Sequence, residues 1–239
     1  MKLKIIKVIL IVAIAITTTA YLSNSQNRKQ RLKIARSQIN AFFASTNNNH
    51  FRAGEIVDID SSIGKNGIAN GNIFDPYGTL KRCYIFTAVS HEDGIDDVKY
   101  AIGVFRDSQI VWMSDMLPGS ENYGYAILDE GFLATKDLNH MGKVDIAAYF
   151  SDGTNPPSGY YLWIFSWDGK KGKCINQQES DGSTSIAADV PFDITDVDGD
   201  GIYEVRAISY ADTLNDSSFY DLKIKSIYKW NGSVFALQK

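Results

Sequence analysis

After Phe51 the chain consists of short apolar runs separated by turn residues, and this pattern restricts the fold more than any other feature. The runs are rich in Val, Ile, Tyr, Phe and Trp, and no helical period of useful length interrupts them. Such residues favour strands, and regularly spaced short strands are typical of all-β domains. We therefore predict strands at Cys83 to Val89, Val98 to Phe105, Gln109 to Met113, Ile146 to Phe150, Tyr160 to Trp167, Val205 to Tyr210 and Leu222 to Trp230.

Three segments share one order of parts, in which an acidic loop is followed by strands and a tight turn. The clearest begins with DVDGDGIYE at Asp196 to Glu204 and reaches the turn Asn231-Gly232. The middle one runs from Asp137 to Asp145 and on to Asp168-Gly169, and the faintest begins at Asp93 to Asp97. Because Asn-Gly and Asp-Gly between apolar strands are strong hairpin signals, the repeated unit is predicted to be an acidic loop plus a small antiparallel meander.

These units resemble the FG-GAP and VCBS-type repeats of integrin α-chain propellers and many bacterial surface proteins, which open a blade with a DxDxDGxxD loop. The resemblance is closest over residues 193–237 and looser over residues 132–175. It implies an all-β, propeller-like or partial-propeller stack of antiparallel meanders at residues 49–239. A closed propeller typically has four to eight blades. Either Ala53 to Arg82 supplies a divergent blade, therefore, or the domain is an open stack.

The clearest loop has the ligand pattern of a calcium site. Calcium takes six to eight oxygen ligands and tolerates irregular geometry. Carboxylates at positions one, three, five and nine and a backbone carbonyl at position seven would come from Asp196, Asp198, Asp200, Glu204 and Ile202. Carboxylates so close in sequence repel one another unless a cation is present. We therefore predict a structural Ca2+ ion here, the alternative being a solvated acidic turn.

The middle loop keeps part of this ligand set. It has Asp137, Asn139 and Asp145, but Met141 stands at position five and removes an oxygen ligand. Because calcium needs many oxygens, we interpret this loop as a degenerate turn that does not bind the ion tightly. For Asp93 to Asp97 a β-hairpin turn is the better interpretation.

The first 25 residues have the layout of an export signal. Lys2, Lys4 and Lys7 precede the uncharged segment Val8 to Leu22, which is apolar through Ile16. A basic start before an apolar segment is typical of such signals, and the apolar region approaches the length that spans a bilayer. We expect residues 1–25 to be an uncleaved anchor in the cell membrane with the C-terminal domain extracytoplasmic, or alternatively a cleaved signal of a secreted protein.

Residues 26–48 are expected to form a basic amphipathic helix or stalk. An apolar stripe at helical spacing comprises Leu32, Ala35, Ile39, Phe42 and Phe43, and the basic residues lie mostly elsewhere. We favour a stripe that packs on the domain, and the alternative is a helix that lies on an anionic membrane surface.

Charge and cysteine content narrow the choice of partner and compartment. Residues after Thr46 carry sixteen Lys or Arg against twenty-eight Asp or Glu, so the body is acidic. Nucleic-acid binding needs a cationic surface, and we exclude it. Cys83 and Cys174 are far apart in sequence, and they are equally compatible with a disulfide and with two buried thiols.

We find no catalytic motif: HExxH, GxSxG, a P-loop and GxGxxG are all missing from the sequence. Tyr161, Trp163, Phe165 and Trp167 share one strand face, and we expect them to be buried because the opposite face is also apolar. The sequence favours a binding or adhesion module with a protein or glycan ligand over an enzyme. The alternatives are an envelope hydrolase acting on a glycan or other polymer, with a site built from loops, and a scaffold that contacts only other proteins.

Overall fold

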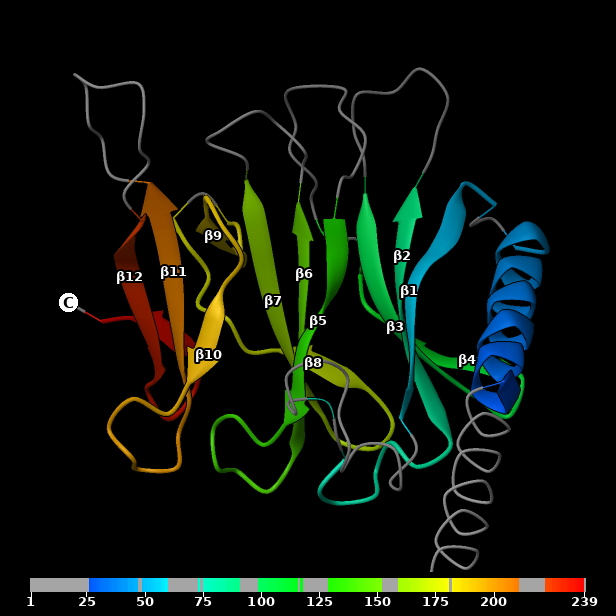
Figure 1. Cartoon of the computed structure of the whole chain (residues 1–239), viewed down its shortest axis with the longest axis horizontal. Helices are drawn as coiled ribbons and strands as arrows, with labels where there is room; N and C mark the ends of the chain where they lie inside the picture. Colours follow the sequence, from blue (N-terminus) through cyan, green and yellow to red (C-terminus); the bar gives the residue numbers. More distant parts are fainter. Residues whose placement is uncertain are drawn as a thin grey trace, which may run out of the picture.

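The computed structural model describes residues 26–46, 49–59, 73, 75–90, 99–115, 117, 129–151, 159–180, 182–210 and 222–238. They form a helix at residues 26–44 and three antiparallel sheets (Figure 1). The first sheet contains, in spatial order, β1 (Phe51–Ile59), β2 (Cys83–Ser90), β3 (Tyr100–Arg106) and β4 (Gln109–Met113). The second contains β5 (Asp129–Lys136), β6 (Val144–Ser151), β7 (Tyr160–Trp167) and β8 (Gly172–Cys174), with β9 (Ile186–Ala188) also paired to β7. The third contains β10 (Asp193–Thr195), β11 (Glu204–Tyr210), β12 (Leu222–Trp230) and β13 (Phe235–Leu237).

The helix and the three sheets lie side by side as four layers in chain order (Figure 1). Three apolar cores separate these layers. Ala35, Ile39 and Phe43 of the helix pack on Phe51, Phe86 and other residues of the first sheet. Residues of the first sheet pack on Trp163 and Trp167 of the second, whose other face meets Val205, Ala207 and Phe235 of the third. The fold is therefore a row of stacked meanders, and in the described part of the chain the helix covers the outer face of the first sheet.

The middle sheet explains why its strands are apolar on both faces. In β7, Leu162, Trp163, Ile164 and Trp167 have no exposed surface, and Phe165 is 4% exposed. A strand buried on both sides reads as a continuous apolar run. The prediction that this aromatic face is buried is confirmed for Trp163, Phe165 and Trp167, whereas Tyr161 is partly exposed.

The hairpin turns predicted at Asp168-Gly169 and Asn231-Gly232 are confirmed, and a further hairpin turn joins β3 to β4. Asp107 and Ser108 join β3 to β4 with φ angles of 50° and 64°, and Gly169 and Gly232 join β7 to β8 and β12 to β13 with φ angles of 92° and 95°. Positive φ at both residues of the two-residue β3–β4 loop matches the right-handed twist of the flanking strands, and the longer β7–β8 and β12–β13 loops place a glycine at the position with positive φ. Each sheet therefore ends on a tight turn whose geometry the local sequence already specifies.

The first repeat unit was placed one strand too late in the sequence. Asp93 to Asp97 fall outside the described residues, and they lie between the ends of the paired strands β2 and β3. The loop that corresponds to the other two acidic loops precedes β2 and begins at Asp75. Likewise, Ala53 to Arg82 do not form a fourth blade, because β1 is the first strand of the first sheet. The prediction was wrong because the Asp75 loop contains a single acid and so lacks the acidic pattern of the other two loops.

The N-terminal helix packs on the domain through its apolar stripe. Ala35, Ile39 and Phe43 are at most 2% exposed, and Leu32 is partly buried. Phe42 was wrongly included in this stripe, since it is 38% exposed. Successive helix positions are about 100° apart, so adjacent Phe42 and Phe43 cannot both face the sheet.

The predicted anchor segment, Val8 to Leu22, lies outside the described residues, and within them no helix has the length and apolarity needed to cross a membrane.

Cys83 and Cys174 are free thiols, the first buried and the second partly buried in the same core. The two-thiol alternative is therefore the one observed.

Candidate metal centre

The loop from Asp196 to Glu204 joins β10 to β11 and is folded around the carboxylate of its first residue. Asp196 accepts hydrogen bonds from the amides of Gly199 at 2.7 Å and Gly201 at 3.1 Å. Both glycines have positive φ, at 77° and 85°, a conformation that costs other residues energy. The glycines of the sequence motif therefore allow the turn that brings the acidic side chains together.

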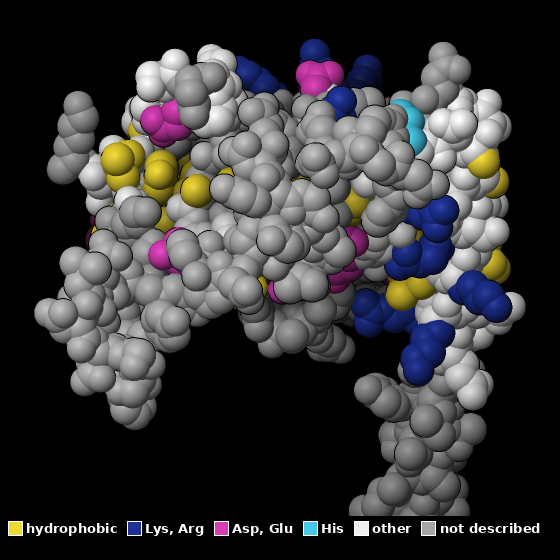
Figure 2. Space-filling view, turned by 90° about the horizontal axis from the view of Figure 1, so that it is seen from above, with side chains coloured by type: hydrophobic (Ala, Val, Ile, Leu, Met, Phe, Trp, Pro, Cys, Tyr) yellow, Lys and Arg dark blue, Asp and Glu magenta, His cyan; other side chains and the backbone are white. Residues whose placement is uncertain are grey.

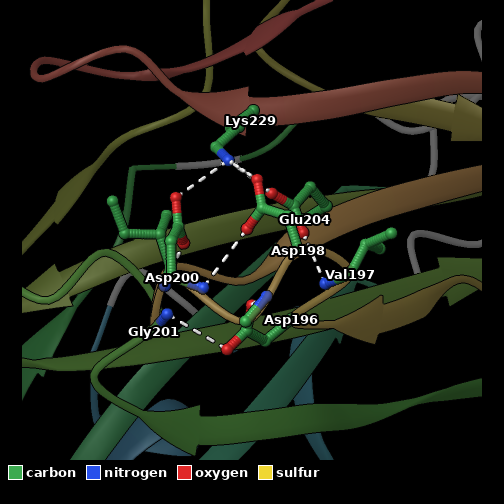
Figure 3. A network of polar contacts seen from close by, with 9 residues as sticks. Asp196, Val197, Asp198, Asp200, Gly201, Glu204 and Lys229 are labelled. Carbon is green, nitrogen blue, oxygen red and sulfur yellow. Dashed lines mark hydrogen bonds and ion pairs between the residues drawn. The ribbon is translucent and has the colours of Figure 1, made fainter.

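Three carboxylates of this loop converge. Oxygen atoms of Asp196, Asp198 and Glu204 all lie within 4.8 Å of one another (Figure 3). Glu204 is 3% exposed and its Oε2 accepts a hydrogen bond from the Val197 amide at 2.9 Å, which orients its side chain. Hard oxygen ligands of this kind suit calcium. This cluster can hold a metal ion, and the sequence identified all three of its residues.

Lys229 provides a cation that sequence reasoning missed. Its Nζ lies 2.6 Å from Asp198 Oδ2, 3.0 Å from Asp200 Oδ2 and 3.0 Å from Glu204 Oε1 (Figure 3). These hydrogen bonds, the one to Asp198 foremost, raise the pKa of the ammonium group. Lys229 thus supplies part of the positive charge that the crowded carboxylates require.

Strand register places Lys229 at the site. Val205 pairs with Tyr228, so the preceding residue on β11, Glu204, lies beside the following residue on β12, Lys229. The pairing of β11 with β12 is the signal that could have revealed this lysine, because counting residues across the two strands places Lys229 opposite Glu204, the ninth residue of the loop. The counting depends on a bulge between Ala207 and Ile208, which the sequence does not reveal.

The other two predicted ligands stand differently. Asp200 is outside the converging group and bonds Lys229 instead, while its Oδ1 accepts the Ile202 amide at 2.8 Å. The hydrogen bond from the Ile202 amide is the largest cause that lowers the pKa of Asp200, and the hydrogen bond from Lys229 is the next. A role for the Ile202 carbonyl as a ligand stays a prediction.

The middle loop has the same backbone arrangement with fewer charges. Asp137 accepts hydrogen bonds from the amides of Met141 at 2.9 Å and Gly142 at 2.8 Å, and Asn139 also accepts one from Met141 at 3.1 Å. Asp145 is fully buried and accepts the Leu138 amide at 3.0 Å. Burial raises the pKa of Asp145 to about 7. Its oxygens and those of Asp137 and Asn139 therefore stabilise the turn itself.

The first acidic loop, missed in the sequence, begins at Asp75. Its Oδ2 accepts the Leu80 amide at 2.7 Å, just as Asp137 and Asp196 accept the amides of Gly142 and Gly201. In all three loops the sixth residue therefore donates to the first. The amide of the second residue bonds the ninth side chain in the later loops, but in this loop the second residue is Pro76, which has no N–H, and the ninth is Cys83. The loop that lacks an N–H at its second residue thus also lacks an acid at its ninth residue.

Three further carboxylates, those of Asp129, Glu130 and Glu55, pack against or bond neighbouring strands. Asp129 accepts a hydrogen bond from the Tyr149 hydroxyl at 3.3 Å. Glu130 lies so close to Gly54 that a Cβ there would meet its carboxylate at 1.8 Å, and a Cβ at Gly131 would meet the Glu55 carboxylate at 2.3 Å. These glutamates pack between the first and second sheets, and burial raises the pKa of each.

The chain matches no protein-family model, no curated protein and no solved structure.

Proposed function

We propose that this chain is a membrane-anchored or secreted binding and adhesion module of the cell envelope, built as a propeller-like β-repeat domain and stabilised by calcium. The observation that carries the proposal is that each of the three meanders has its own loop of one common design, and that among these three loops the last one brings three carboxylates together. The resemblance of this loop to FG-GAP and VCBS-type repeats agrees with it. The ligand would be a protein or a glycan.

Calcium binding at this loop is an exchange reaction. Calcium requires oxygen ligands at about 2.3–2.6 Å, and the Lys229 ammonium group already lies 2.6–3.0 Å from carboxylates that the ion would use. The ion and the ammonium group cannot occupy one position, because both charge and volume oppose it. A bound calcium ion would therefore displace the Lys229 ammonium group and would leave Asp200 able to act as a further ligand.

Binding is favoured over hydrolysis by the state of the carboxylates. A general acid and base must be free to exchange protons with a substrate. Asp129 is hydrogen-bonded to Tyr149, and Glu130 is wedged against the first sheet. Both residues thus have structural roles in the described part of the chain, which supports a module that binds its ligand without transforming it.

A calcium titration of the full chain in detergent, followed by thermal unfolding, tests the proposal. A ligand at hundredfold excess over its Kd stabilises a protein by about 2.7 kcal/mol, which corresponds to a rise in Tm of roughly 5–10 °C for a domain of this size. We expect Asp198→Asn to abolish the rise. Lys229→Met should shift the titration to lower calcium concentrations because the competing ammonium group is removed.

The control is Asp168→Asn, which removes an exposed carboxylate from the β7–β8 turn and should leave the titration unchanged. If neither the parent chain nor Lys229→Met responds to millimolar calcium, the loop is an acidic turn that forms without the ion, and the calcium proposal is wrong.

A further inference from the structure

The three acidic loops meet at one end of the domain. They lie along the lower edge of Figure 1, where they lead into β2, β6 and β11. The Tyr77 hydroxyl donates to Asp137 Oδ2, which joins the first loop to the second. The Tyr203 amide donates to the Leu138 carbonyl at 2.9 Å, which joins the third to the second. The loops thus form one continuous ridge, which we name the loop ridge.

Each loop exposes one large apolar side chain on this ridge. Tyr77 is 48% exposed, Met141 58% and Val197 58%. Single exposed apolar residues are ordinary on protein surfaces, but these three occur on structurally equivalent loops that contact one another. Exposed cations occur in the same loops at Lys81, Arg82 and Lys143.

The N-terminal helix begins at the same end of the domain. Arg31 forms an ion pair with Asp58 near the end of β1, and Asn40 bonds the Ala53 amide near its start. The helix is therefore antiparallel to β1, so residue 26 lies where β1 ends and the loop ridge begins (Figure 1). Figure 2, seen from the end opposite the loop ridge, shows that Lys and Arg side chains also lie beside this helix on that side.

From this placement we infer that the loop ridge faces and contacts the lipid bilayer that the apolar N-terminal segment enters. The inference rests on the proposed membrane anchoring. Three residues lie between Leu22 and residue 26, and the four steps from one to the other span at most about 14 Å. The ridge is thus held near the bilayer surface, where apolar tips flanked by Lys and Arg gain from burial in the interface and from attraction to anionic headgroups.

Lys229 also suits the ridge to this role. The third loop carries three aspartates that anionic headgroups would repel, and the ammonium group, or calcium in its place, offsets part of this charge. Val197 can then approach the interface beside Met141. The direction of the helix places the start of the helix, and so the preceding apolar segment, at the end of the domain that carries the loop ridge. Contact with a protein partner would not require this placement, so we favour the bilayer as the surface that the ridge contacts.

The test uses the full chain reconstituted into phosphatidylcholine vesicles containing about a third phosphatidylglycerol, an anionic lipid. A polarity-sensitive nitrobenzoxadiazole label is attached at Met141→Cys and, separately, at Val197→Cys. The control is Ala187→Cys, since Ala187 is exposed and pairs with Tyr161 near the start of β7, at the opposite end of the sheet. Labelling of the parent chain measures the background from Cys83 and Cys174, which are buried and partly buried.

We expect blue-shifted emission at Met141→Cys and Val197→Cys and quenching by spin-labelled lipid, with water-like emission at Ala187→Cys. Flotation of the vesicles separates this inference from its premise. A chain that floats but gives water-like emission at all three positions overturns the bilayer-facing ridge and leaves the anchor intact. A chain that does not float overturns both the anchor and the ridge contact.

Discussion

Asp145 is the group through which we expect pH to change the stability of the domain. Its side chain is completely buried, and Oδ2 accepts the Leu138 amide at 3.0 Å. Burial is the largest cause that raises its pKa from 3.8 to about 7. The folded protein therefore holds this proton more tightly than the unfolded chain does.

The sign and size of the effect follow from this difference. Below about pH 4 both states are protonated, and the group has no effect on stability. Between about pH 4 and pH 7 the unfolded chain loses the proton while the folded protein keeps it, so the free energy of unfolding falls as pH rises. A difference of about three pKa units at about 1.4 kcal/mol each sets an upper limit of about 4 kcal/mol on the loss. Above about pH 7 the loss is complete.

Asp145→Asn removes this titration with little change in shape. The amide oxygen of asparagine still accepts the Leu138 amide, so we expect the variant to lose less stability than the parent chain as pH rises. Urea unfolding between about pH 4 and pH 8, followed by the fluorescence of buried Trp163 and Trp167, measures the free energy at each pH. Asp107→Asn, in the exposed β3–β4 turn, controls for the loss of one carboxylate.

All samples contain a chelator, so that metal binding does not contribute. The reasoning fails if the Asp145→Asn variant and the parent chain lose equal stability over this pH range, because the buried carboxyl would then have the same proton affinity in both states.

The remaining predictions concern the turn, the helix and the thiols. Gly201→Ala should cost roughly 1–2 kcal/mol because of its positive φ, and more because the added Cβ would lie 2.9 Å from the His140 ring of the neighbouring loop. Gly232 has φ +95 and open space around it, so Gly232→Ala should lose only the energy that the positive φ costs when both variants are measured by urea unfolding. Phe43→Ala should cost about 3–5 kcal/mol and Phe42→Ala less than about 1 kcal/mol, and equal losses would contradict the packing of the helix. Burial raises the pKa of Cys83 to about 11, so its reaction with a thiol reagent at neutral pH should be slow until urea unfolds the chain, and fast reaction of the native protein would show that the first core is open.

Much of the repeat could be predicted from local sequence. The turns at Asp168-Gly169 and Asn231-Gly232 need residues that tolerate positive φ, and β7 is apolar on both faces because it lies in the middle layer. The converging carboxylates of Asp196, Asp198 and Glu204 were predicted because their spacing along one short loop determines how close they lie.

The Asp75 loop could not be found in the same way. It shares with the other loops a hydrogen bond from the sixth amide to the first carboxylate, but its ninth residue is Cys83 and its second is Pro76. A search for repeated acids therefore missed it. What the loops have in common is a backbone arrangement, which different side chains can satisfy.

The sequence by itself determined the strands, the tight turns and the acidic loop, since each depends on the preferences of neighbouring residues. Only the tertiary structure decided that Lys229 lies among the carboxylates, that the three loops form one ridge, and that the helix begins at that end. These relations join residues far apart in the chain, and they depend on strand register and on the order of the layers. A shift of register by one residue turns every side chain of a strand to the opposite face. The sequence near Glu204 could therefore specify the conformation of the acidic loop without specifying that Lys229 lies beside it.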